Sequence, residues 1–157
     1  MTELSGRTAL VTGSVSGIGL AVAQELARAG VRIALHGLAG DMEIREAREA
    51  LLAAGAPQAE FFGGDLRHPD QIDGLIEAVE AWGADASGGL DILVNNAGIQ
   101  HTASLADMPA ETWDAILAVN LSAAFHTMRA SLPAMARRGY GRVVNIASVH
   151  GLVASID

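Results

Sequence analysis

Short apolar runs alternate along this chain with longer stretches in which apolar residues recur at helical spacing. Such alternation is typical of βαβ units that join into a parallel sheet. Strands are predicted at residues 8–12, 31–36, 59–63, 90–95 and 141–147, and helices at 17–29, 41–54, 69–82 and 112–138. We therefore predict an α/β fold of the Rossmann type, with one doubly wound parallel sheet in a single domain over residues 1–157.

The last predicted helix, at residues 112–138, is apolar on more than one face. Trp113, Ile116, Phe125 and Met128 are among the apolar residues spread around it. A helix that only covers a sheet needs one apolar stripe, so the second face predicts packing against another body. We expect that body to be a partner subunit, which would make the protein a homo-oligomer.

The composition narrows the kinds of partner. Ten Lys and Arg residues against eighteen Asp and Glu residues give a formal net charge of −8, which disfavours nucleic acid or an anionic membrane as a partner. The sequence has no cysteine, no recognisable signal peptide and no apolar run long enough to span a membrane. The five histidines show no metal-ligand spacing. We expect a cytoplasmic protein without a metal site.

The strongest chemical signal is the glycine-rich turn at residues 12–19, between the first predicted strand and the first predicted helix. Gly13, Gly17 and Gly19 allow the backbone to turn tightly and to approach a ligand closely. The unpaired N–H groups at a helix start favour phosphate oxygens. The turn therefore predicts a site for the pyrophosphate of a nucleotide, although the glycines could serve only close packing of helix against strand.

Other candidate residues follow the carboxyl ends of later strands, where sheets of this type bind ligands. Ala97 and Gly98 leave room for a ribose. Asn95 and Asn96 could bond the backbone of neighbouring strands and lock the turn, or contact the ligand directly. Asp65 could accept a hydrogen bond from an adenine amino group, or it could cap a helix.

Two more polar residues have alternative readings. Asn120 lies in an otherwise apolar helical stretch, where its side chain is costly unless hydrogen-bonded, so it could simply bond the sheet. Ser148 follows the last predicted strand, where its hydroxyl could hydrogen-bond the oxygen of a carbonyl or an alcohol. A serine at a strand end is otherwise commonplace.

Taken in order, the motifs at 12–19, 65–66 and 95–98, with Asn120 and Ser148, resemble those of the short-chain dehydrogenases/reductases. The resemblance covers essentially the whole chain and implies that Ser148 is catalytic and that Asn120 anchors a water in a proton relay. The cofactor site that it implies comprises Thr12, Gly13, Ser16, Gly17, Ile18, Gly19, Asp65, Leu66, Asn96, Ala97 and Gly98.

The segments at 95–101 and 145–153 resemble those of family members that interconvert D-3-hydroxybutyrate and acetoacetate. This resemblance implies a small hydroxy or oxo acid as substrate, with Gln100 and His150 as two donors that converge on its carboxylate. A structural role for His150 stays open. Alternative functions are another reductase of the family, such as one acting on a 3-oxoacyl thioester, or NAD binding without catalysis.

The cofactor is expected to be NAD. Residues 36–40, after the second predicted strand, include no acid that would bond the 2′-hydroxyl of adenosine and no arginine that would pair with a 2′-phosphate. Ser16 is also neutral, where family members that bind this phosphate often carry a basic residue.

The resemblance also implies a catalytic tyrosine, with a lysine four residues later, downstream of the serine. The sequence has no lysine, and its single tyrosine, Tyr140, precedes Ser148. A tyrosine needs a nearby cation to act as a base near neutrality. We therefore expect the amino-terminal part of a dehydrogenase, lacking the C-terminal strands and helices, with the strand at 141–147 as an exposed edge.

Overall fold

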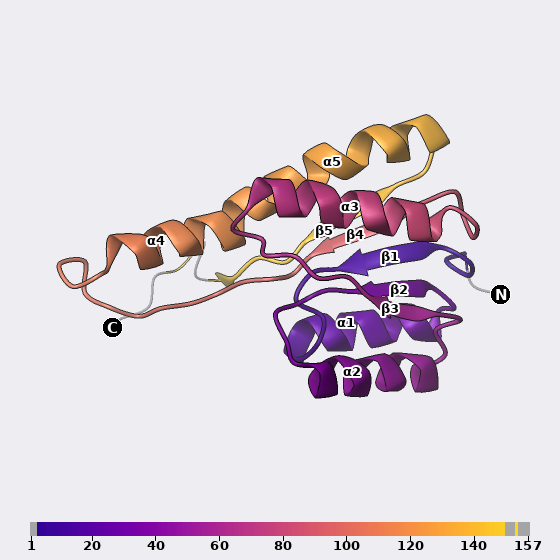
Figure 1. Cartoon of the computed structure of the whole chain (residues 1–157), viewed down its shortest axis with the longest axis horizontal. Helices are drawn as coiled ribbons and strands as arrows, with labels where there is room; N and C mark the ends of the chain where they lie inside the picture. Colours follow the sequence, from indigo (N-terminus) through magenta and orange to yellow (C-terminus); the bar gives the residue numbers. More distant parts are fainter. Residues whose placement is uncertain (1–2, 150–152, 154–157) are drawn as a thin grey trace.

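Strands and helices alternate along the computed structural model, which describes residues 3–149 and residue 153 (Figure 1). In chain order the elements are β1 (Thr8–Val11), α1 (Gly17–Arg28), β2 (Arg32–Leu35), α2 (Asp41–Ala54), β3 (Ala59–Phe61), α3 (Pro69–Gly83), β4 (Ile92–Asn95), α4 (Ala110–Leu117), η1 (Ala118–Ser122), α5 (Ala123–Arg138) and β5 (Arg142–Asn145). Among the described residues, no helix combines the length and the apolar character needed to cross a membrane.

The five strands form one parallel sheet in the order β3-β2-β1-β4-β5. β1 lies at its centre, where Ala9 is in register with Ile33 of β2 and with Ile92 of β4. The chain first builds outward from β1 through β2 to β3 and then returns to the other side of β1. The predicted doubly wound sheet is confirmed, with a switch point between β1 and β4, where such sheets bind ligands.

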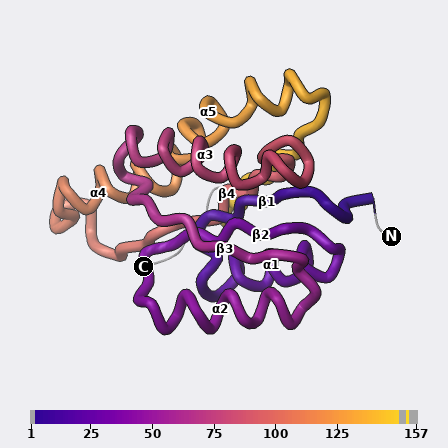
Figure 2. The backbone as a smooth tube through the Cα atoms, turned by 45° about the vertical axis from the view of Figure 1, so that its right-hand side comes forward, coloured from indigo at the N-terminus to yellow at the C-terminus, as the bar shows by residue number. Residues whose placement is uncertain are grey.

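Helices cover both faces of the sheet. Figures 1 and 2 show α1 and α2 against one face and α3 and α5 against the other. Within β1, Ala9 and Val11 pack in the same apolar cluster as Ala23 of α1, whereas Leu10 packs with Ile72 of α3. Successive strand residues point to opposite faces, so a central strand covered on both sides must be apolar throughout.

The prediction of one helix at 112–138 is wrong in its detail. The helical segment begins at Ala110, passes through the π-helical η1, and continues as α5 to Arg138. A π-helical turn holds one more residue than an α-helical turn and often occurs near functional sites. Periodicity did not reveal it, because one extra residue rotates the apolar stripe without ending it.

An apolar surface remains exposed at the β5 side of the sheet. β5 is an edge strand, as predicted, and its Val144 is 46% exposed. Trp113 of α4, Leu121 of η1 and Phe125 of α5 are 50%, 67% and 59% exposed. The second apolar face predicted for the helical segment therefore exists, and the single chain leaves it open to solvent.

Candidate nucleotide-binding cleft

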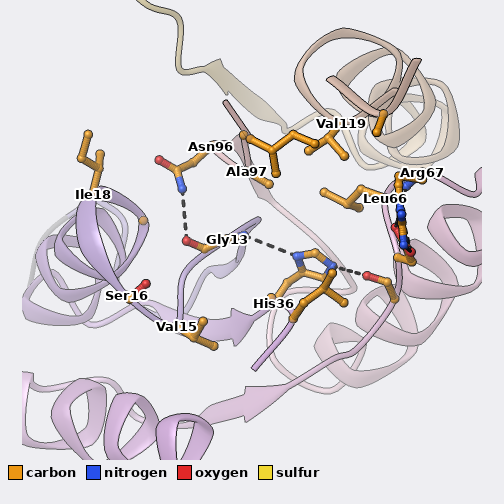
Figure 3. A pocket seen from close by; sticks show the side chains of 18 residues that line it. Gly13, Val15, Ser16, Ile18, His36, Leu66, Arg67, Asn96, Ala97 and Val119 are labelled. Atoms are coloured by element: carbon orange, nitrogen blue, oxygen red, sulfur yellow. Dashed lines mark hydrogen bonds and ion pairs between the residues drawn. The ribbon is translucent and has the colours of Figure 1, made fainter. Parts of the chain in front are cut away.

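A cleft of about 650 Å³ opens at the carboxyl end of the sheet (Figure 3). The turns after β1, β2, β3 and β4 form its walls, and Ala115 of α4 and Val119 of η1 complete the lining. The other lining residues are Gly13, Val15, Ser16, Ile18, Gly19, His36, Gly37, Leu38, Gly64, Asp65, Leu66, Arg67, Asn96, Ala97, Gly98 and Ile99. Of the residues predicted to hold a cofactor, all except Thr12 and Gly17 line this cleft.

The three glycines of the turn after β1 serve two different physical needs. Gly13 and Gly17 have φ values of +64° and +56°, a conformation that side chains other than hydrogen disfavour. A Cβ on Gly19 would lie 2.1 Å from the carbonyl oxygen of Gly13. Close packing, the alternative considered for these glycines, is therefore real at Gly19, and it coexists with the tight turn at the start of α1.

Thr12 and Asn96 lock the glycine-rich turn to the end of β4. The buried hydroxyl oxygen of Thr12 accepts hydrogen bonds from the backbone N–H groups of Asn96 at 2.9 Å and Ala97 at 3.0 Å. The Asn96 amide donates to the carbonyl oxygens of Thr12 at 2.9 Å and Gly13 at 3.2 Å. These four bonds hold two cleft walls together, and they confirm the turn-locking role considered for Asn96.

Asn95 makes a different set of contacts from the one predicted. Its side chain does not bond neighbouring backbone: its amide donates to the Asn145 side chain of β5 at 2.8 Å, and its carbonyl oxygen accepts from the Thr127 hydroxyl of α5 at 2.7 Å. Asn95 is buried, and the two side chains, Asn145 and Thr127, provide the hydrogen bonds that its amide needs. The consequence is a cross-link between β4, the edge strand β5 and α5.

Asp65 is part of a turn and an ion pair. Its carboxylate accepts hydrogen bonds from the Arg67 backbone N–H at 2.9 Å and from Arg67 Nε at 3.0 and 2.9 Å. Hydrogen bonding to Arg67 lowers the pKa of the Asp65 carboxyl to about 2. The capping alternative for Asp65 is wrong, because His68 occupies the N-cap of α3. The carboxylate nonetheless lines the cleft.

Asn120 clamps the loop after β4. Its side-chain oxygen accepts from the backbone N–H of Ile99 at 2.8 Å, and its amide donates to the Ile99 carbonyl at 2.9 Å. The Asn120 side chain in the apolar stretch is thus hydrogen-bonded to a loop and not to the sheet itself. These two hydrogen bonds to Ile99 place the π-helical turn beside the cleft, where the neighbouring Val119 forms part of the lining.

Ser148 and Gln100, which are predicted to act on substrate, are not among the residues that line the cleft. Ser148 is exposed beyond the carboxyl end of β5, and Gln100 is exposed in the loop after β4. His150 lies outside the described residues. Tyr140 precedes β5, at the opposite end from Ser148, and its ring packs against the guanidinium groups of Arg7 at 3.6 Å and Arg142 at 4.7 Å. Its place in the fold agrees with the prediction that it cannot replace the family's tyrosine.

Sequence reasoning missed several cleft residues. Arg67 follows Asp65 by two residues, which is close enough for the turn that joins them, but arginines near acids are too common to signal a site. Val15 and Leu38 are apolar residues in loops, and no pattern marks them. The sequence marks His36 only as neither an acid nor an arginine at the end of the second strand, and as one of five histidines without metal-ligand spacing. The structure buries its ring between two turns of the cleft.

Comparison with known proteins agrees with this architecture. The sequence model of the family described as short chain dehydrogenase matches residues 7–157. A D-beta-hydroxybutyrate dehydrogenase from Rhizobium meliloti is 46% identical over 149 residues, which cover 95% of this chain and 56% of that relative.

Two solved structures show the same fold. An NAD+-bound xylitol dehydrogenase has a TM-score of 0.87 at 30% identity, covering 98% of this chain and 57% of that one. A 3-oxoacyl (acyl-carrier-protein) reductase from Agrobacterium tumefaciens C58 with NADP bound has a TM-score of 0.85 at 39% identity, covering 95% of this chain and 55% of that one.

The sheet order and the cleft at its switch point define an α/β protein of the Rossmann class. The chain belongs to the short-chain dehydrogenase family, whose model matches nearly its whole length. It spans somewhat more than half the length of the relatives described above. Within the described part of the chain, no three histidine, cysteine, aspartate or glutamate side chains gather as possible metal ligands.

Proposed function

We propose that this chain forms the cofactor-binding part of an NAD-dependent oxidoreductase that interconverts D-3-hydroxybutyrate and acetoacetate. The observation that carries the proposal is the cleft at the start of α1, where Ser16 and Gly19 line the wall. Backbone N–H groups at a helix start suit a pyrophosphate, and Ala97 and Gly98 offer little bulk beside a ribose. The 46% identity to a D-beta-hydroxybutyrate dehydrogenase supports the choice of substrate.

The end of β2 supports NAD over NADP. The cleft presents Gly37 and Leu38 there, and neither offers charge to a 2′-phosphate. A Cβ on Gly37 would lie 2.9 Å from Val15 Cγ2. Any side chain at this position, whether an acid or an arginine, would therefore have to displace Val15. The cationic Arg67 also lines the cleft, but its guanidinium binds the Asp65 carboxylate.

The chemistry that we propose divides between cofactor and protein. When bound, the nicotinamide would accept a hydride from the carbon that carries the substrate hydroxyl. Ser148 would hydrogen-bond the substrate oxygen and Asn120 would anchor a water, while Gln100 and His150 would hold the carboxylate. The hydroxyl proton needs a base. Tyr140 cannot be that base, because it lies at the opposite end of β5 from Ser148. In a protein as long as the relatives, we propose the family's tyrosine with its lysine for this role.

We further propose that two copies of the protein associate through the exposed apolar surface of α4, η1 and α5. Trp113, Leu121 and Phe125 lie along this segment and are half-exposed or more. Full burial of an exposed apolar side chain of this size gains about 1.5–3 kcal/mol, and covering the exposed part of each of these side chains would gain a corresponding share. A partner copy would supply the second body that the helical pattern requires.

Titration with NADH, followed by nicotinamide fluorescence, tests cofactor binding. We expect saturable binding, with weaker binding of NADPH. Gly19→Ala should abolish binding, because its Cβ would collide with the Gly13 carbonyl oxygen. Gly74→Ala in α3 is the matched control, since a Cβ there meets nothing within 4 Å. A cooperatively folded wild-type chain that binds no NADH would disprove the proposal.

The substrate is tested separately. A protein extended to the length of the relatives, with the tyrosine and lysine, should form NADH from D-3-hydroxybutyrate and NAD. We expect no NADH formation by the 157-residue chain, which has no lysine. A preference of the extended protein for a 3-oxoacyl thioester would instead assign it to the other reductase activity.

A further inference from the structure

The His36 ring connects two turns of the cleft, as the dashed lines from its two nitrogen atoms show in Figure 3. His36 directly follows the last residue of β2, Leu35, and is 2% exposed. Its Nδ1 atom lies 3.4 Å from the backbone nitrogen of Gly13, and its Nε2 atom lies 2.9 Å from the carbonyl oxygen of Gly64. The ring therefore spans from the turn after β1 to the turn that precedes Asp65.

These two contacts define the form of the ring. The Gly13 N–H donates, so Nδ1 must be an unprotonated acceptor, whereas the Gly64 carbonyl accepts, so Nε2 must carry the hydrogen. The backbone of His36 adds two further bonds: its carbonyl accepts from Ser14 N–H at 2.8 Å, and its N–H donates to Ser14 Oγ at 3.1 Å. Only the neutral imidazole with hydrogen on Nε2 satisfies every partner.

We propose that His36 is a positioning residue for the cofactor: as a neutral ring it holds the glycine-rich turn and the Gly64–Asp65 turn at the spacing that binds a dinucleotide, and protonation breaks this link. The proposal rests on the proposed binding of NAD. Protonated Nδ1 would point a hydrogen at the Gly13 N–H, so the ring would lose this bond and the two cleft walls would separate.

The surroundings of His36 fix the direction of the pH effect. Burial lowers the pKa of His36, while the Gly64 carbonyl and the Asp65 carboxylate oppose that shift. The charged or titratable groups facing it come from the turn after β3: Asp65, its partner Arg67, and His68, whose Nε2 lies 3.8 Å from Asp65. The neighbouring residues 13–15 and 37–38 carry no charge. Because the pKa of His36 in the folded chain lies below the ordinary histidine value of about 6.5, the ring stays neutral and the link stays complete at that pH. The link is lost only as the pH falls further, through the lowered pKa.

The test measures the NADH dissociation constant at about pH 7.5 and at the lowest pH at which circular dichroism shows that the chain is still folded. For the wild-type chain we expect affinity to fall about fivefold over this range, as for the loss of one hydrogen bond. His36→Gln keeps a donor toward Gly64 and His36→Asn keeps an acceptor toward Gly13, but neither titrates. Both should bind NADH about fivefold more weakly than wild type at the higher pH, with no further loss at the lower pH.

The matched control is His68→Gln, which removes the neighbouring histidine and should keep the wild-type pH profile. A second measurement needs no variant: long-range ¹H–¹⁵N spectra of histidine-labelled protein should show the His36 ring with hydrogen on Nε2. NADH binding that is equal or stronger at low pH, a His36→Gln profile like that of wild type, or hydrogen on Nδ1 would each overturn the proposal. Absence of NADH binding at both pH values would overturn the proposed function and this inference together, whereas a flat profile with tight binding overturns the inference alone.

Discussion

At the scale of single residues, Thr12 shows how a buried hydroxyl can support a cleft that it does not line. Thr12→Val keeps the shape of the side chain but leaves the N–H groups of Asn96 and Ala97 without their acceptor. We expect the free energy of unfolding to fall by about 1–3 kcal/mol, measured by urea denaturation. Thr12→Ser, which retains the oxygen, should lose much less; an equal loss in both variants would contradict this account.

Asp65 gives a prediction about pH. Its carboxyl pKa of about 2 depends on Arg67, so Arg67→Ala should raise it toward the ordinary aspartate value of about 4. Because the folded-state pKa is depressed, the contribution of the pair to stability is present above about pH 4 and is lost as the pH falls through about 2. A ¹³C titration of the carboxyl carbon measures the shift directly, and an unchanged midpoint in Arg67→Ala would show that another group is responsible.

The sequence was enough to predict several residues of this site but not the contacts that they make. The glycines and Asn96 were predictable because their roles depend on backbone geometry that few residue types allow. The partners of Asn95 were not predictable, because only the folded chain brings Asn145 and Thr127 into reach. Arg67 lies only two positions from Asp65, but an arginine near an acid is too common to identify the ion pair. Long-range contacts of short polar side chains leave no local pattern.

At the scale of elements, Asn120 of η1 holds the loop after β4 through two hydrogen bonds to Ile99. Asn120→Leu removes both bonds to Ile99, so the loop after β4 should open more often. We expect amide hydrogen exchange at Ile99 to accelerate about tenfold or more, as for the loss of two hydrogen bonds. Asn120→Asp retains the acceptor for the Ile99 N–H and should show a smaller increase. Unchanged exchange in Asn120→Leu would mean that packing alone holds the loop.

Strands and helices were predicted closely, because a parallel sheet covered on both faces demands continuous apolar runs and each crossover helix demands an amphipathic one. Most observed boundaries differ from the predicted ones by one or two residues. The π-helical turn was not predictable, since one extra residue leaves the apolar periodicity continuous. The contact that its Asn120 makes with Ile99, 21 positions away, also leaves no local pattern.

At the scale of the whole molecule, the exposed apolar surface leads to a prediction about association. Phe125→Glu places a charge within that surface and should shift the protein toward the monomer in light scattering coupled to size-exclusion chromatography. Met42→Glu is the matched control, because Met42 is 67% exposed on α2, in the opposite layer. A wild-type protein that is monomeric at all concentrations, or a control that dissociates equally, would refute the interface.

The sheet order also determines how the chain can fold during synthesis. β1 pairs with β2 across a short separation, since Ala9 opposes Ile33, but with β4 across a long one, since Ala9 also opposes Ile92. Closing the longer loop costs about 1 kcal/mol more conformational entropy than closing the shorter one. The unit β1-α1-β2-α2-β3 can therefore assemble on the ribosome before β4 has been translated. Until then the β4 side of β1 stays unpaired, and its free backbone groups can pair with another chain.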